Sequence, residues 1–398
     1  MTKKSDAPAI RFKGFSDAWE QRKVQDVADR FDNLRIPVAA NLRVHGTTPY
    51  YGANGIQDYV EGFTHDGEFV LVAEDGANDL KNYPVKCVNG RIWVNNHAHI
   101  LQGKAGIADN SFLAFAISQS DIESLLVGGG RAKLNAETLM SIEFRLPCLQ
   151  EQYRIGEYLT QLDHLITLHQ RKFEKLTNVK KSMLEKMFPQ NGSSYPEIRF
   201  KGFTDPWEQR KLSEIADKVT EKNAGLQYVE TFTNSAEFGI ISQRDFFDHD
   251  IAKLGSLDGY YIVKNEDFVY NPRISTSAPV GPINRNKLGR TGVMSPLYTV
   301  FRPHDVDTTY LEHFFKCAYW HSFMNFNGDS GARSDRFSIK DDVFFQMPIP
   351  LPYIDEQRKI GELLTRLDHL ITLHQRKPFL MKWRTSDANR NKTNRLVL

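Results

Sequence analysis

Residues 352–377 read PYIDEQRKIGELLTRLDHLITLHQRK and repeat residues 147–172, which read PCLQEQYRIGEYLTQLDHLITLHQRK. The two copies are identical at 19 of 26 positions. Their apolar residues step alternately by four and three positions, which is the spacing of a heptad seam. A helix from residue 152 to residue 188 would be about 55 Å long, more than one domain core requires. We therefore predict two long helices that pair as an intramolecular antiparallel coiled coil.

A second repeat shows how the chain is organised. Residues 10–23 (IRFKGFSDAWEQRK) return as residues 198–211 (IRFKGFTDPWEQRK), with 12 of 14 positions identical. The segments that follow, 24–146 and 212–351, share little sequence and differ in length by 17 residues. One duplicated scaffold thus carries two different modules. We predict an α+β fold with two pseudo-symmetric α+β domains, separated by the two long antiparallel helices.

The expected boundaries follow from the repeats. We assign residues 1–148 to the first conserved segment and module, 149–190 to the first spacer helix, 191–352 to the second module and 353–377 to the second spacer helix. Strand-like runs in the first module are 69–73, 91–94 and 142–146, with a helix around 110–126. In the second module they are 239–242, 260–263, 267–270 and 298–301, with a helix at about 308–325.

The seam residues of the two helices are the candidates for spacing and partner binding. They are Ile155, Leu159, Leu162, Ile166, His169 and Phe173 in the first copy, and Ile360, Leu364, Leu367, Ile371 and His374 in the second. The two histidines occupy equivalent positions, where a polar residue usually fixes register, so we interpret them as structural and not as metal ligands. Pro378 should end the second helix. The polar tail, 378–398, is expected to be disordered or loosely docked.

Composition limits the classes of protein. The chain has 398 residues, 12% aromatic residues and a net charge of +2, so it can form two cores and is only mildly basic. Its three cysteines show no metal or disulfide spacing, and no leader or run of 18 apolar residues is present. We therefore expect a cytoplasmic protein without a membrane partner.

Polar loops in both modules are candidates for reading DNA. Arg and Lys pair with guanine, Asn pairs with adenine, and glycine allows close approach to phosphate. The candidate residues are Asn54, Asn78, Lys81, Asn95, Asn96, His97, Arg131, Lys133 and Asn135 in the first module, and Arg244, Arg273, Ser275, Ser277, Arg285, Lys287, Arg290, Arg333 and Arg336 in the second. For any single loop an ordinary solvated turn is the simpler interpretation. Their occurrence in both modules favours a DNA-binding surface.

Catalytic signatures are missing from the sequence. There is no GxxxxGK[ST] loop for a nucleoside triphosphate, and the stretch Asn271-Pro272-Arg273-Ile274 lacks the second proline and the aromatic residue of the adenine methyltransferase motif. His97 and His99 have no further metal ligands at a recognisable spacing. We therefore predict no catalytic residues and no metal site.

Taken together, the phrases GFxxxWEQRK and LDxLITLHQRK, with passages such as YYGANGI, WVNNHAHIL and GARSDRFSIKDD, closely resemble the specificity subunit of type I restriction-modification enzymes. The resemblance covers nearly the whole chain. It implies two target recognition domains, each reading one half of a split, asymmetric site in double-stranded DNA from the major groove, with the helices setting the gap.

The resemblance also implies partners that carry the chemistry. Two modification (M) subunits would methylate adenine at N6 with S-adenosylmethionine, and restriction (R) subunits would use ATP and Mg for translocation and cleavage. This chain would bind no cofactor of its own. Family members usually continue the second helix as far as the first, so Pro378 places the outer coiled coil in doubt.

Other interpretations stay open at this point. A fused restriction enzyme would need nuclease and cofactor motifs that the sequence lacks. A coiled-coil scaffold that binds proteins would show no salt-dependent affinity for DNA. A truncated or defective specificity subunit, awaiting a partner half, is the third alternative.

Overall fold

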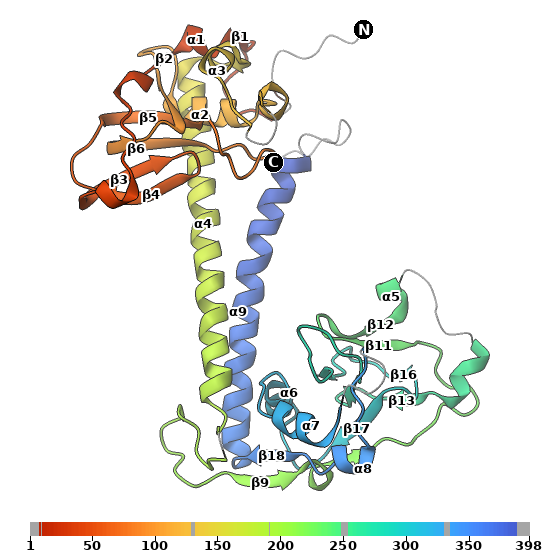
Figure 1. Cartoon of the computed structure of the whole chain (residues 1–398). Coiled ribbons are helices and arrows are strands. Elements are labelled where there is room, and N and C mark those ends of the chain that lie inside the picture. Colours follow the sequence, from red (N-terminus) through yellow and green to blue (C-terminus); the bar gives the residue numbers. More distant parts are fainter. Residues whose placement is uncertain are drawn as a thin grey trace. The chain divides into compact units, whose positions relative to one another are not determined.

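The computed structural model describes residues 8, 10–128, 132–190, 192–247, 254–329 and 335–387. The chain divides into two compact units, Met1–Thr167 and Leu168–Leu398. The boundary falls inside helix α4 (Leu149–Lys186), so that one helix begins in unit 1 and ends in unit 2 (Figure 1). Within the described residues, no helix has the length and apolar character needed to cross a membrane.

Unit 1 is built around a six-stranded sheet with the order β2-β7-β5-β6-β3-β4. Its strands are β2 (Ala28–Arg30), β3 (His45–Gly52), β4 (Gly55–Val60), β5 (His65–Ala73), β6 (Val85–Val94) and β7 (Ala98–Gly103). All neighbours are antiparallel except β3 and β6, which are parallel. The short helices α1 (Val24–Val27), α2 (Asn110–Ser118) and α3 (Ala136–Ser141) complete the module. A separate pair, β1 (Glu20–Lys23) with β8 (Glu143–Leu146), leads into α4.

Unit 2 has a smaller, four-stranded antiparallel sheet with the order β10-β17-β14-β15. These strands are β10 (Ala216–Lys218), β14 (Phe268–Tyr270), β15 (Ile283–Arg285) and β17 (Thr299–Pro303). Three two-stranded pairs surround it: β9 (Glu208–Lys211) with β18 (Pro348–Leu351), β11 (Phe232–Ser235) with β12 (Gly239–Ser242), and β13 (Tyr261–Val263) with β16 (Gly292–Met294). The helices are α5 (Gln243–Phe247), α6 (Thr308–Phe314), α7 (His321–Asn327), α8 (Asp341–Phe344) and α9 (Ile354–Asp387).

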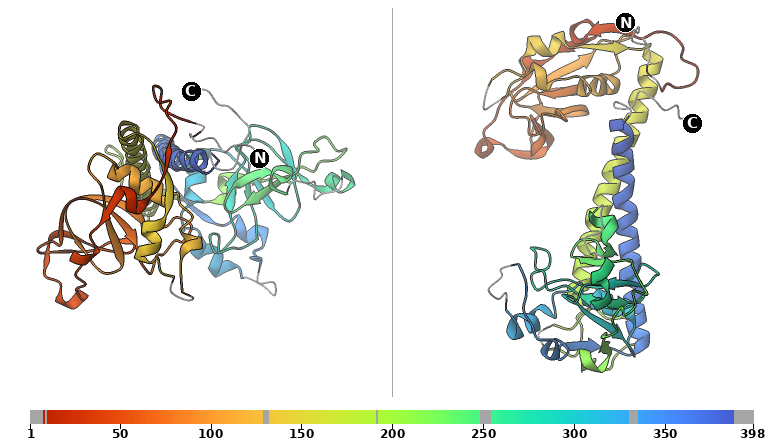
Figure 2. Two further views of the ribbon diagram at one scale, coloured as in Figure 1. Left: turned by 90° about the horizontal axis from the view of Figure 1, so that it is seen from above. Right: turned by 90° about the vertical axis from the view of Figure 1, so that its right-hand side faces the viewer.

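The antiparallel helix pair is present in unit 2, where the second half of α4 lies beside α9 (Figures 1 and 2). His169 Nδ1 and His374 Nδ1 are 2.8 Å apart. Lys180, further along α4, forms an ion pair with Asp368, which comes earlier along α9. The two contacts run in opposite directions along the two helices, which is the antiparallel arrangement expected from the sequence.

Burial along α4 follows the heptad pattern. From residue 157 to residue 178, the shielded positions are Leu159, Leu162, Ile166, His169, Phe173 and Leu176, and every other residue in this range is exposed. In α9, Ile360, Leu364 and Leu367 are buried in the core of unit 2 and Ile371 and His374 are partly shielded. The contact between the two histidines uses one ring nitrogen as donor and the other as acceptor, which favours a structural role in register.

Three expectations about helices are wrong. The helix expected over 110–126 ends at Ser118, because the chain turns and buries Ile122. The helix expected over 308–325 divides into α6 and α7, where Trp320 enters the core and donates its indole N–H to the Phe315 carbonyl. Helix α9 continues past Pro378 to Asp387, so residues 378–387 are helical. Pro378 removes one N–H donor, but helical turns on both sides let the helix continue. Residues 388–398 lie outside the described part of the chain.

Candidate nucleic-acid interface

In unit 1, three of the predicted loops meet and form one surface, which we call the unit-1 loop cluster (residues 52–55, 74–84 and 95–97). Asn54 Nδ2 donates to the Gly76 carbonyl, and Asn54 Oδ1 accepts from the Asn78 N–H, both at 2.9 Å. The Glu74 N–H donates to the His97 carbonyl at 2.9 Å. These bonds join segments that follow β3, β5 and β6, so the fold brings together residues that are dispersed in the sequence.

The predicted residues of unit 1 differ in what they offer to a ligand. Asn54, Asn78, Lys81 and Asn96 are exposed. Asn135 is also exposed and precedes α3, where its side chain makes no capping bond. Asn95 is buried, accepts from the His97 N–H and donates to Gln57, so it shapes the turn and is not placed to reach a base. Our assignment of Asn95 to base reading was wrong. Arg131 lies outside the described residues.

Several basic side chains at or beside the unit-1 loop cluster contact carboxylates. Lys133 Nζ is 2.8 Å from Glu74 Oε1, and Arg35 also donates to Glu74. Burial would raise the pKa of Glu74, but the hydrogen bonds from Lys133 and Arg35 outweigh it, and the pKa lies below its usual value. His97 Nδ1 is 2.6 Å from Asp75 Oδ1. An anionic ligand at this surface would have to compete with these carboxylates for the basic side chains.

A buried charge network supports the cluster from behind. His99 contacts Asp32 Oδ2 through Nδ1 at 2.7 Å and the Leu134 carbonyl through Nε2 at 2.9 Å. Burial by itself would raise the pKa of Asp32. The hydrogen bonds from His99 and from the Ile100 N–H together have the larger effect, so the pKa lies below its usual value and the carboxyl is ionised. The His99 ring thus links the Asp32 carboxylate to the Leu134 backbone. The sequence gives no local signal for this network, because its members are far apart in the chain.

In unit 2, Arg273 and Arg336 lie on paired segments and form the best candidate site, which we call the unit-2 arginine pair. Their backbones form an antiparallel bridge, and the Ile274 N–H donates to the Asp335 carbonyl at 3.0 Å. Arg273 is exposed and Arg336 is half-buried. Neither guanidinium has an ion-pair partner among the residues that the structure describes. Since neither guanidinium forms an ion pair within the described residues, both are available to an anionic ligand.

The loop that carries Arg273 is held in place from both sides. Ser275 and Ser277 are exposed, with their hydroxyls 3.2 Å apart, and the Ala278 N–H donates to Ser275 Oγ. Gly281 has φ +85°, and a Cβ at this position would lie 2.2 Å from the Asn271 carbonyl oxygen. Only glycine fits there without displacing the backbone. The loop conformation is thus fixed, and with it the positions from which Arg273 and the two serine hydroxyls project.

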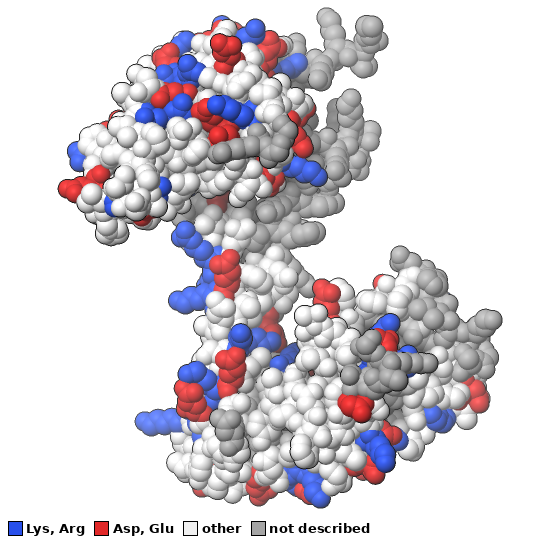
Figure 3. Space-filling model, in the orientation of Figure 1, with Lys and Arg blue, Asp and Glu red and all other residues white. Residues whose placement is uncertain are grey.

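Three other predicted cations of unit 2 are paired with acids. Arg285 is nearly buried between Glu312 and Glu266, so it stabilises the fold, and its assignment to DNA reading was wrong. Lys287 also pairs with Glu312, at 2.7 Å, although its side chain is exposed. Arg290 forms a bidentate pair with Glu230. Arg244 is exposed at the start of α5. Arg333 lies outside the described residues. In the view of Figure 3 acidic and basic side chains alternate over both units.

Glu312 gives a testable pH dependence. Burial would raise its pKa, but the charges of Lys316 and Lys287 and their hydrogen bonds outweigh this and lower the pKa from 4.5 to about 2. A carboxyl with a depressed pKa stabilises the fold above its unfolded value and loses this contribution as pH falls through its folded value. Relative to Glu312→Gln, the wild type should therefore lose about 3 kcal/mol between pH 5 and pH 2. Urea unfolding of both proteins over this range tests it. If the unfolding free energies of the wild type and Glu312→Gln changed equally with pH, the lowered pKa of Glu312 would be contradicted.

A matched pair of joints attaches each module to its long helix. In unit 1, Arg11 donates two bonds of 2.7 Å to the buried carboxylate of Glu151, and in unit 2 Arg199 donates two bonds of 2.8 Å to Glu356. These residues lie in the sequence repeats, so the repeats themselves were the signal that could have revealed them. The pairs fix where each helix begins relative to its own module.

The next helix residue completes each joint. Gln152 Nε2 donates to the Pro147 carbonyl while its Oε1 accepts from the Asp109 N–H, and Gln357 makes the same two bonds with Pro352 and Asp307. Asp109 and Asp307 then cap α2 and α6. The duplication therefore extends into the modules, although their sequences show little similarity.

The two repeats correspond to two matches with a single family model. The model described as type I restriction modification DNA specificity domain matches residues 16–178 and 204–379, which is most of the chain. This protein belongs to that family. Each specificity domain contains one module and one long helix, as the repeats indicated.

Several individual proteins are similar to this chain. A putative type I restriction enzyme specificity subunit of Haemophilus influenzae, S.HindORF215P, is 44% identical over 146 residues, which is 37% of this chain and 38% of that protein. The MjaVIII specificity subunit of Methanocaldococcus jannaschii is 24% identical over 388 residues, covering 90% of this chain and 88% of that protein.

The fold of the specificity domains also has a solved counterpart. The crystal structure of the type I restriction-modification system S subunit from M. genitalium matches with a TM-score of 0.64 and 11% identity. The match covers 98% of this chain and all of that one. At this identity the likeness concerns the fold alone. It agrees with two α+β modules and long helices.

Proposed function

We propose that this protein is the DNA sequence-specificity subunit of a type I restriction-modification complex. Each module reads one half of a bipartite, asymmetric site in double-stranded DNA, and the helix pair sets the gap between the halves. The observation that carries this proposal is that two unlike α+β modules, each matched by the DNA specificity domain model, lie on a duplicated scaffold with matched joints. A duplicated scaffold approximates the twofold symmetry of duplex DNA, while different modules allow a target that is not a palindrome.

The contacts with DNA follow from the two surfaces. The unit-1 loop cluster presents exposed amides of Asn78 and Asn96, which suit the adenine edge in the major groove, while the Asn54 amide holds the loops together. The unit-2 arginine pair presents guanidinium groups, which suit guanine or phosphate. The two modules therefore differ in chemistry, as they must to read different half-sites.

The chemistry of the complex would lie in other subunits. We infer that two modification subunits bind this chain and use S-adenosylmethionine to methylate adenine at N6, and that restriction subunits use ATP and Mg. This chain would hold none of these cofactors and catalyse no step. It would determine where on the DNA the partner subunits act.

Methylation mapping tests this function directly. The chain is co-expressed with a type I modification subunit in a host without adenine methylation, and methyladenine is located by single-molecule sequencing. We expect one split motif with two fixed half-sites. No split motif, beside a modification subunit that is active with an intact specificity subunit, would reject the proposal and favour a protein-binding scaffold or a defective subunit.

The same assay should show which half-site unit 2 reads. Arg273→Ala/Arg336→Ala should weaken DNA binding by at least about tenfold, because each contact is worth about 1–3 kcal/mol, and should lower the salt slope by about 2 if both contact phosphate. If the two arginines contact base edges, methylation should lose discrimination in one half-site only. Lys201→Ala/Arg210→Ala removes the same charge elsewhere in unit 2 and should leave the motif unchanged. Equal effects of the two double variants would contradict the assignment.

A further inference from the structure

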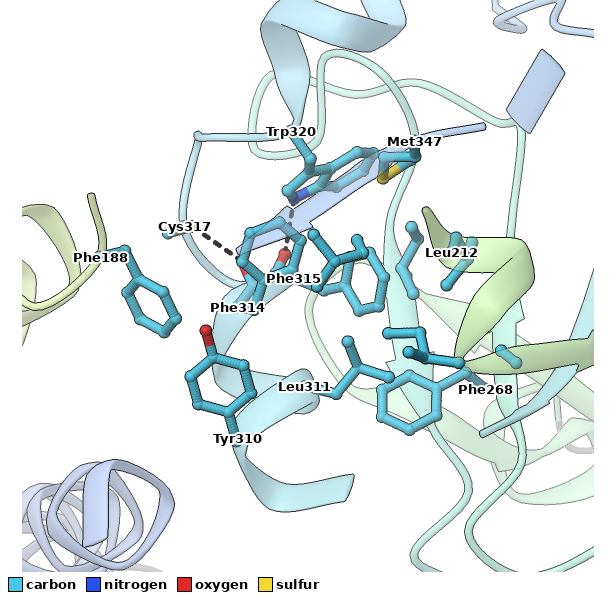
Figure 4. Close-up of a cluster of buried hydrophobic side chains, with 14 of the residues drawn as sticks. Phe188, Leu212, Phe268, Tyr310, Leu311, Phe314, Phe315, Cys317, Trp320 and Met347 are labelled. Carbon is cyan, nitrogen blue, oxygen red and sulfur yellow. Dashed lines mark hydrogen bonds between the residues drawn. The ribbon is translucent and has the colours of Figure 1, made fainter. Parts of the chain in front are cut away.

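The end of α4 fills an apolar socket in unit 2. Phe188 is fully buried, and its ring centroid lies 5.5 Å from that of Tyr310 and 5.9 Å from that of Phe314 (Figure 4). The ring centroid of Trp207 is 6.4 Å away. Met187, Ile360 and Leu364 belong to the same core cluster. The socket is thus formed by the repeated tryptophan, the start of α9 and one face of α6.

Unit 1 contains the equivalent residues. The sequence repeats equate Trp207 with Trp19, Ile360 with Ile155 and Leu364 with Leu159. The matched caps Asp307 and Asp109 equate Tyr310 with Phe112 and Phe314 with Ala116. All five equivalents, namely Trp19, Phe112, Ala116, Ile155 and Leu159, line one hollow of about 630 Å³, which we call the unit-1 socket.

Burial distinguishes the filled socket from the open one. Trp207, Ile360 and Leu364 are 5%, 1% and 0% exposed, whereas their equivalents Trp19, Ile155 and Leu159 are only half-buried. Ala116 in place of Phe314 makes the hollow larger still. Unit 1 therefore retains apolar surface at the place where unit 2 buries the Met187-Phe188 side chains, and covering that surface would be favourable.

The sequence of this chain does not repeat the plug. In the register of the long repeat, Met183, Leu184, Met187 and Phe188 correspond to Ala388, Asn389, Lys392 and Thr393. Small and polar side chains cannot replace two methionines, a leucine and a phenylalanine in an apolar socket. A second copy of this chain is not the source either, because its own Met187 and Phe188 are buried in unit 2.

We propose that the unit-1 socket binds the C-terminal end of an amphipathic helix from a different polypeptide, with adjacent Met and Phe side chains as the plug. The lining residues all belong to unit 1, and in unit 2 the corresponding plug is only the end of α4 with Met187 and Phe188. The incoming helix therefore needs to contribute only its last turns.

A peptide with the sequence of residues 173–190 (FEKLTNVKKSMLEKMFPQ) is the probe, because this chain shows how that sequence fills such a socket. The labelled peptide is titrated with the full chain and followed by fluorescence anisotropy. We expect saturable binding that Phe188→Ala in the peptide weakens by about tenfold or more. The inference does not depend on DNA reading, since no DNA is present in the assay.

Variants of the chain locate the binding site. Leu159→Asp places a charge in the socket and Ser120→Trp fills it, and each should reduce peptide affinity at least about tenfold. Leu165→Asp lies on the exposed face of α4 and should have no effect. Circular dichroism confirms that each variant is folded, and the two socket variants give independent readings.

Three results would overturn the proposal. The first is binding of the peptide that does not saturate. The second is an equal loss of peptide affinity in Leu159→Asp and Leu165→Asp. The third is a severalfold rise in peptide affinity after deletion of residues 388–398, because that would identify the end of this same chain as the occupant.

Discussion

Phe188→Ala should lower the free energy of unfolding of unit 2 by about 3–5 kcal/mol, the range for a large aromatic residue removed from a packed core. The side chain is fully buried among Trp207, Tyr310 and Phe314. Its loss removes apolar contacts and leaves a cavity that the rigid surrounding rings cannot close. The end of α4 should also lose its attachment to the module.

Urea unfolding with hydrogen exchange resolved by segment measures this effect, because it separates unit 2 from unit 1. Phe326→Ala is the matched control, since the side chain of Phe326 is 88% exposed and its removal should change stability by less than about 0.5 kcal/mol. Similar losses in the two variants would show that Phe188 is not a core anchor. Faster hydrogen exchange confined to residues 176–188 and the unit-2 socket around Phe188 would support the structure.

Arg199→Ala should destabilise unit 2 by about 3–5 kcal/mol, because it leaves a buried carboxylate without its partner. The Glu356 side chain is completely buried and receives two hydrogen bonds of 2.8 Å from Arg199. The hydrogen bond from Arg199 to Glu356 raises the pKa of the arginine, so the guanidinium stays charged. The bond holds the repeated segment 198–211 against the first turn of α9.

An exposed pair in the same unit provides the control. Arg290 and Glu230 have the same bidentate geometry, but their side chains are 48% and 33% exposed. Arg290→Ala should cost less than about 1 kcal/mol, since water replaces the lost bonds. The double variant Arg199→Met/Glu356→Met should recover much of the loss of Arg199→Ala, because no unpaired charge remains buried. Equal costs for the exposed and the buried pair would contradict this explanation.

The corrected residues show why loop assignments from sequence were uneven. Asn54 and Asn95 both follow strands and look alike in sequence, yet Asn54 is exposed and Asn95 is buried beside Gln57. Arg273 and Arg285 are both arginines near strand ends, but only Arg285 meets an acid on a neighbouring helix, Glu312 of α6. Residue type alone does not show whether a cation faces a carboxylate or solvent.

The helices show the opposite case. The heptad spacing placed the shielded face of α4 and α9 correctly, because helical periodicity is a local property of the chain. Pro378 was over-interpreted, since one missing hydrogen bond does not end a helix with formed turns on both sides. The division of the expected helix at 308–325 depended on the burial of Trp320, which no local pattern reveals.

The sequence by itself determined the duplication, the two long helices with their seam and the membership of the specificity-domain family, because repeats and heptads are written in neighbouring residues. Only the tertiary structure decided which cations are held by acids, which asparagine is buried and which socket is filled. These depend on contacts between residues far apart in the chain, such as Phe188 with Tyr310 and Arg199 with Glu356. Side-chain burial and ion pairing depend on how the whole fold packs, and this packing differs between the two modules although their scaffold is repeated.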